Sequence, residues 1–117
     1  MEHTLKLQHK YFELMKKGIK TIEVRLLDEK RQKIKVGDEI EFLKEPEREE
    51  KLLTQVKNLY YYHSFEELLD AYPIECFAGK ETSKEELLSI LSSFYSKDEE
   101  KKYGVVGIRV EVIKVTL

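Results

Sequence analysis

The chain changes from a helical pattern to a strand pattern within one short stretch, which reads Gly18-Ile19-Lys20-Thr21-Ile22-Glu23-Val24-Arg25. Glycine enters left-handed backbone conformations without a Cβ clash, so Gly18 is typical of a helix end. Because side chains alternate along a strand, the polar members beyond Lys20 share one face, namely Thr21, Glu23 and Arg25. We therefore expect any function to lie on this polar face.

The residues on either side predict an α+β fold. A helix over residues 9–17 ends at Gly18, and an alternating stretch over residues 3–7 predicts an edge strand before it. Further strands are predicted over residues 22–27, 39–43, 52–62 and 105–117. The last strand changes the parity of its apolar face, which indicates a β-bulge near Val112. The charged run between residues 28 and 38 is predicted to be a solvated loop.

Residues 64–103 are predicted to form a helical insertion. Ser64-Phe65-Glu66-Glu67 and Ser83-Lys84-Glu85-Glu86 both have the form of a capping box, which marks a helix start. Pro73 ends the first of these helices, and an apolar linker follows over residues 74–79. The second helix has an apolar stripe that we expect to be buried, formed by Leu87, Leu88, Ile90, Leu91 and Phe94. Ser96 opens a last helix that ends near Tyr103.

Length and composition limit the class of protein. A chain of 117 residues predicts a single domain, spanning residues 1–117. The 21 basic and 23 acidic residues give a net charge of −2, which argues against duplex DNA or an anionic membrane as a partner. No apolar run approaches the roughly 20 residues that span a bilayer. The lone cysteine, Cys76, cannot form an intrachain disulfide, so we expect a cytoplasmic location.

The sequence predicts neither a metal site nor a cofactor. The three histidines lack zinc-ligand spacing, and the five scattered glycines form neither a phosphate-binding loop nor a dinucleotide fingerprint. The run Tyr60-Tyr61-Tyr62-His63 has two interpretations, which both stay open. It is either a stacking platform for nucleobases, with Tyr61 as a ligand contact, or a set of strand tyrosines whose rings pack in the protein.

Three segments resemble the ASCH domain family. Gly18, Lys20, Glu23 and Arg25 have the spacing G-x-K-x-x-E-x-R, which resembles the family signature. Residues 35–40 resemble its Gly-Asp turn, and residues 104–109 its closing strand. The resemblance implies a small β-barrel of the PUA-like type, with five or six mostly antiparallel strands and a polar cleft beside them. It also implies RNA or nucleotide binding in that cleft.

The signature residues suit such a ligand. Lys20 can place a positive charge against a phosphate, and Arg25 can offer its planar fork to a phosphate or a base edge. Glu23 can accept a hydrogen bond from a base or hold Arg25 in position. With Thr21 and Tyr61, these three residues make up the expected ligand-binding set, and we expect a variant lacking Lys20 and Arg25 to keep its fold. The oligomeric state is not indicated.

An enzyme is the alternative function. One subgroup of the family removes the acetyl group from N4-acetylcytidine, and Lys20 resembles its lysine. Glu23, however, stands where that subgroup has a threonine, and the subgroup's glutamate cannot be aligned, so the nearby carboxylates are Glu66, Glu67 and Glu75. The alternative is therefore a hydrolase for acetylated cytidine or a related nucleoside, in which Lys20 and Glu23 are the catalytic residues and support attack by water. Such a role requires that burial lower the pKa of Lys20.

Overall fold

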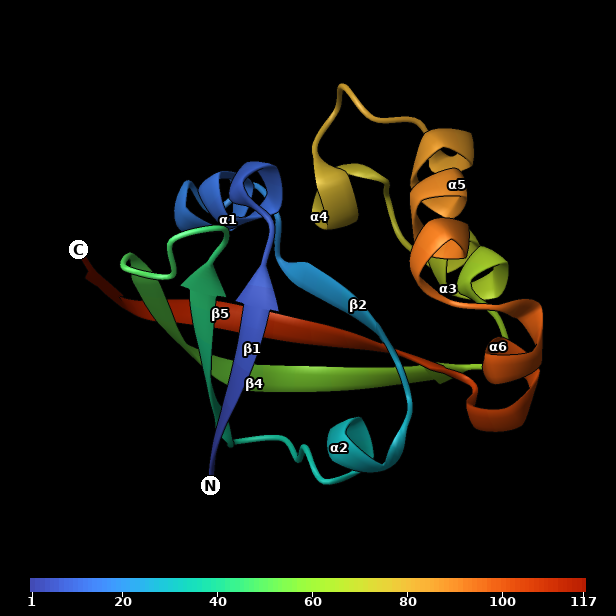
Figure 1. The fold of residues 1–117 in the computed structure, drawn as a ribbon, viewed down its shortest axis with the longest axis horizontal. Coiled ribbons are helices and arrows are strands. Elements are labelled where there is room, and N and C mark those ends of the chain that lie inside the picture. Colours follow the sequence, from blue (N-terminus) through green and yellow to red (C-terminus); the bar gives the residue numbers. More distant parts are fainter.

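Five strands form one mixed sheet in the computed structural model, which describes residues 1–117 (Figure 1). Their order in the sheet is β1 (Glu2–Leu7), β3 (Glu39–Lys44), β4 (Lys51–Tyr62), β5 (Val105–Thr116) and β2 (Ile22–Leu26). β1 pairs with β3 in parallel, and the other neighbours are antiparallel. The predicted α+β class and mostly antiparallel sheet are therefore confirmed.

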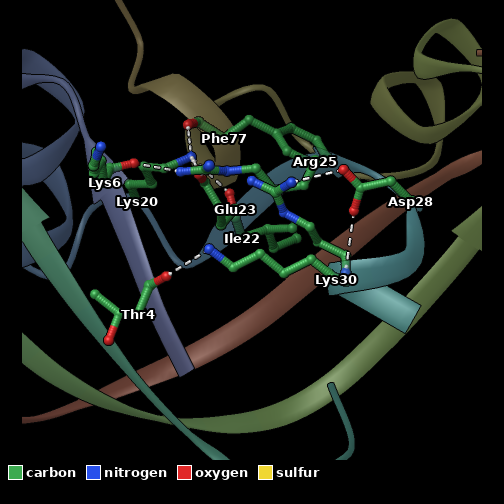
Figure 2. Close-up of polar contacts among 10 residues, drawn as sticks. Thr4, Lys6, Lys20, Ile22, Glu23, Arg25, Asp28, Lys30 and Phe77 are labelled. Carbon is green, nitrogen blue, oxygen red and sulfur yellow. Dashed lines mark hydrogen bonds and ion pairs between the residues drawn. The ribbon is translucent and has the colours of Figure 1, made fainter. Parts of the chain in front are cut away.

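The sheet is not closed, so the predicted barrel is not confirmed. β1 and β2 are its two edges and form no backbone ladder with each other. Long side chains cross the gap instead. Arg25 Nη2 donates to the carbonyl of Lys6 at 2.5 Å, and Lys30 Nζ donates to the carbonyl of Thr4 at 3.2 Å (Figure 2). The two edges are thus joined by cationic side chains rather than by strand pairing.

The long pair formed by β4 and β5 contains two irregularities. Leu53 pairs with Lys114 and Thr54 with Val112, which leaves Ile113 as an extra residue. A second shift leaves Lys57 without a partner. The first irregularity confirms the β-bulge predicted near Val112. Bulges bend a strand and increase its twist, which accounts for a sheet whose edges approach each other.

Six helices surround the sheet. They are α1 (His9–Lys16), α2 (Glu29–Gln32), α3 (Phe65–Ala71), α4 (Glu75–Ala78), α5 (Lys84–Phe94) and α6 (Lys97–Tyr103). α2 lies where a loop was predicted, because the Asp28 side chain caps it by accepting from Arg31 N at 3.2 Å. α4 lies in the predicted apolar linker. The capping boxes of Ser83 and Ser96 are present, whereas Ser64 caps α3 without the return bond.

Two apolar cores position the polar face of β2. One core packs Phe12 and Met15 of α1 against the sheet. The other packs the insertion against β2 and β5, with Leu68 and Phe77 fully buried. Figure 1 shows α3, α5 and α6 gathered on one side, away from both termini. No helix has the length and apolar character to cross a membrane.

Candidate functional site

Lys20 lies at the centre of a buried polar cluster (Figure 2). Its side chain is 4% exposed. Nζ donates to the carbonyls of Ile22 at 2.8 Å and Phe77 at 2.7 Å, and lies 3.1 Å from Glu23 Oε1. An ammonium group has three N–H donors, so these partners use all of them. Burial lowers the pKa of Lys20, and the charge of Glu23 opposes that shift.

Glu23 is held between two cations. Oε2 accepts from Arg25 Nε at 2.6 Å, while Oε1 faces Lys20. Burial by itself raises the pKa of Glu23, but the charges of Arg25 and Lys20 outweigh it and hold this pKa below its ordinary value. Glu23 is therefore a charged carboxylate that neutralises one of its two neighbours, and the cluster keeps a net charge of one cation.

Arg25 is the member of the cluster with unused donors. Nε is bound to Glu23 and Nη2 to the carbonyl of Lys6. A guanidinium carries five N–H donors in a planar fork, and Nη1 has no partner within the protein. Lys20 and Arg25, which were both predicted to contact the ligand, therefore differ in their capacity to do so. Lys20 has no donor left for a phosphate, whereas Arg25 can still donate to a ligand.

A cavity of about 360 Å³ lies between these residues and α5. We call it the signature cavity. Its polar lining consists of Lys6, Gln8, Lys20, Glu23, Arg25 and Glu45. Its hydrophobic lining is larger, and consists of Leu7, Tyr11, Val24, Phe77, Leu87, Ile90, Leu91, Phe94 and Tyr95. The cavity is thus a mainly apolar space with one cluster of charges in its wall.

Several lining groups are neutral and free to bind. The side chain of Gln8 is exposed and forms no hydrogen bond within the protein. Tyr11 and Tyr95 are half-buried, and their hydroxyls also form no hydrogen bond within the protein. Burial, helped by the charge of Glu23, raises the pKa of Tyr11, so its hydroxyl stays a donor. Phe94 is 58% exposed, which corrects the expectation that it belongs to the buried stripe of α5.

The structure brings together only part of the predicted ligand-binding set. Thr21 does not line the signature cavity, and its Oγ1 is buried without a hydrogen-bond partner. Tyr61 is 58% exposed and lines a different cavity of about 760 Å³. The carboxylates considered for an enzyme, Glu66, Glu67 and Glu75, also lie outside the signature cavity. No group of three or more His, Cys, Asp or Glu is arranged to hold a metal ion.

Sequence reasoning missed the cavity residues that come from outside β2. Gln8 and Tyr11 lie on either side of the start of α1, and Glu45 follows β3. No local pattern marks them, because they meet β2 only through the fold. The position of Phe94 at the end of α5 could have indicated that its side chain is exposed, since the last residue of an apolar helical stripe can extend beyond the core.

Comparisons with known proteins agree on one family. A family model described as ASCH domain matches residues 5–114. The crystal structure of the hypothetical protein PH0355 is 42% identical with a TM-score of 0.84, covering 97% of this chain and 100% of that one. The solution NMR structure of protein PF0455 from Pyrococcus furiosus is 40% identical with a TM-score of 0.77, covering 97% and 99%. No curated protein matches the chain. With this match over nearly its whole length, the chain belongs to the ASCH domain family.

Proposed function

We propose that the protein binds single-stranded RNA and that the signature cavity receives the base of one unpaired nucleotide. The observation that carries this proposal is that the buried charges of Lys20 and Glu23 are already paired within the protein. Lys20 and Glu23 satisfy each other and nearby backbone groups, so the ligand meets a mainly apolar wall in which Arg25 is the cation of the cluster that still has free donors. A planar, largely apolar base with polar edges fits that lining.

Particular side chains can supply the contacts. Phe94 presents an exposed ring at the cavity, and stacking of a base on an aromatic ring contributes about 1–3 kcal/mol. Gln8 can both donate to and accept from a base edge. Arg25 Nη1 can donate to a base oxygen or to a phosphate. Membership of a family that is generally RNA-binding supports the same ligand class.

Calorimetric titration with the four ribonucleosides, their monophosphates and N4-acetylcytidine tests this proposal. We expect at least one of them to bind, and Phe94→Ala to weaken that binding about tenfold because the stacking surface is lost. Gln8→Ala should change the preference among bases more than the affinity for the preferred one.

Ile113→Ala is the matched control. Ile113 is 51% exposed and lines neither of the two cavities, so its truncation removes a comparable exposed apolar side chain. Affinity that is unchanged in Phe94→Ala, or reduced equally in Ile113→Ala, would contradict base binding in the signature cavity.

Hydrolysis of an acetylated nucleoside is the second candidate function, and the lowered pKa of Lys20 is the observation that favours it. The lining weighs against it, because no serine, threonine or cysteine is present to form an acyl intermediate. Water would have to attack directly, with Lys20 as base. We expect mass spectrometry to show no deacetylation of N4-acetylcytidine beyond that of heat-denatured protein. Turnover above that background would establish the hydrolase instead.

A further inference from the structure

A second cavity lies next to α6, and the proposed function does not use it. We call this space of about 760 Å³ the α6 cavity. Its wall includes the end of β4, with Tyr61, Tyr62 and His63, and one face of α6, with Lys101 and Lys102. Tyr61 is 58% exposed, so an aromatic ring is available beside two ammonium groups.

Four of the six charged residues of α6 line the cavity. Lys97, Glu100, Lys101 and Lys102 line the cavity, whereas Asp98 and Glu99 do not. Glu100 is already used, because it accepts from Phe65 N at 2.8 Å and pairs with Lys97 at 3.4 Å.

Lys101 and Lys102 form no ion pair. Lys102 Nζ lies 4.9 Å from the centre of the Tyr103 ring. The lining also contains one carboxylate without an ion pair, Glu67, so the two unpaired lysines outnumber it. Together with the exposed ring of Tyr61 in the same wall, they indicate an anionic ligand that also has an aromatic face.

The two cavities follow one another along the same two segments. Arg25 lines the signature cavity and Leu27 lines the α6 cavity, and two residues of strand span about 7 Å. Between α5 and α6, Tyr95 likewise lines the signature cavity and Lys97 lines the α6 cavity. The amide of Leu27 donates to the carbonyl of Gly104 at 3.0 Å, which joins the end of β2 to the end of α6. Lining residues of the two cavities therefore lie about 7 Å apart along this segment, a distance that a strand of a few nucleotides can span.

We propose that the α6 cavity binds the neighbouring nucleotides of the RNA strand whose base enters the signature cavity. Lys101 and Lys102 contact phosphates, and Tyr61 stacks on an adjacent base. This inference rests on the proposed function and adds to it a second contact region for the same strand, outside the signature cavity. Attraction between the lysines and the phosphates, and stacking of a base on the tyrosine ring, provide the binding energy.

Fluorescence anisotropy with a labelled single-stranded RNA 12-mer of mixed sequence tests the inference. Lys101→Gln/Lys102→Gln should weaken 12-mer binding at least tenfold. It should also reduce the slope of log affinity against log salt by about 1.4, from two phosphate contacts at about 0.7 each. Tyr61→Ala should weaken the same binding about tenfold. Neither variant should change the affinity for the mononucleotide that the wild-type protein prefers.

Lys33→Gln/Lys114→Gln is the matched control, because both lysines are exposed, line neither cavity and form no ion pair. This control variant changes the net charge of the protein by the same amount as Lys101→Gln/Lys102→Gln. Equal effects of the two double variants would overturn the inference and leave the proposed function intact if Phe94→Ala still weakens mononucleotide binding. A fall in mononucleotide affinity in the α6 variant would also overturn it. A 12-mer that binds independently of Phe94 would overturn the proposed function, and with it the continuous path.

Discussion

Lys20 shows how tertiary contacts change the meaning of a sequence position. As a lone cation beside a charged strand, it was expected to face a phosphate. In the fold it joins β2 to α4, because Nζ binds the carbonyl of Phe77 as well as Glu23. A buried ion pair adds little stability compared with an apolar replacement of the whole cluster, but the loss of one partner leaves a buried charge without compensation. The residue is therefore structural as well as part of the cavity wall.

Lys20→Met should lower the free energy of unfolding by about 3 kcal/mol or more, because Glu23 would keep only Arg25 and two carbonyls would lose their donor. Urea denaturation measures this change. For the variant that lacks both Lys20 and Arg25, which the sequence predicted to keep its fold, we therefore now expect a loss of stability as well.

Lys17→Met is the control for that measurement. Lys17 is exposed and forms no ion pair, so its replacement should change the free energy of unfolding by less than about 0.5 kcal/mol. If Lys20→Met proved as mild as Lys17→Met, the buried cluster described above would have no energetic importance.

At the scale of elements, the parallel pair of β1 and β3 is held partly by side chains at its end. Parallel strands cannot be joined by a tight hairpin, so their start must be fixed by other contacts. Asp38, just before β3, accepts from His3 of β1 at 2.8 Å and from the amide of Lys35 at 3.0 Å. These hydrogen bonds lower the pKa of Asp38 from 3.8 to about 2. The Gly-Asp turn thus anchors an edge strand.

This shift predicts a pH dependence that belongs to the β1–β3 pair. Because the folded pKa lies below the unfolded one, the unfolded state binds more protons between pH 4 and 2, and stability from Asp38 falls as the pH falls. The difference in free energy of unfolding between the wild-type protein and Asp38→Asn should be largest above about pH 4 and should decrease as the pH falls toward 2. Urea denaturation across this range checks it.

Glu47→Gln gives the comparison for the Asp38 experiment. Glu47 is exposed and has no ion pair or hydrogen bond from its side chain, so its removal should leave the acid dependence unchanged. A free-energy difference for Asp38→Asn that stays constant down to pH 2 would exclude Asp38 as the anchor of β1.

The whole molecule presents two cavities on a surface with little net charge. The formal charge of −2 gives no general attraction for polyanions, so binding depends on the local lysines, the exposed rings and access to unpaired bases. Duplex DNA keeps the faces of its bases in the stack, so it offers no base face on which Phe94 or Tyr61 could stack.

A DNA duplex should therefore compete at least tenfold less well than single-stranded RNA of equal length for the labelled 12-mer. Competition anisotropy at one fixed salt concentration measures this ratio, because affinities for nucleic acids change steeply with salt. Equal competition by the duplex would show that phosphates alone determine binding, and would count against base recognition in either cavity.

The sequence by itself determined the features that depend on near neighbours along the chain. Alternation predicted the strands, capping-box patterns predicted the starts of α3 and α5, and a change of parity predicted the bulge beside Val112, because each signal lies within a few residues. It also placed Lys20 and Glu23 three positions apart, close enough to pair. α2 and α4 escaped prediction because one turn of helix carries too short a pattern.

Only the tertiary structure decided what the site residues do. The partners that bury Lys20 and orient Arg25 include the carbonyls of Phe77 and Lys6, which are distant in sequence and are backbone groups that no side-chain pattern reveals. The wall that contains Phe94 forms only because α5 packs beside β2. The open sheet has the same origin, since side chains rather than a ladder fill the gap between its edges. Burial and long-range contacts determine the protonation of the cluster, the access of a ligand to the signature cavity and the gap between the sheet edges. None of these is a local property of the chain.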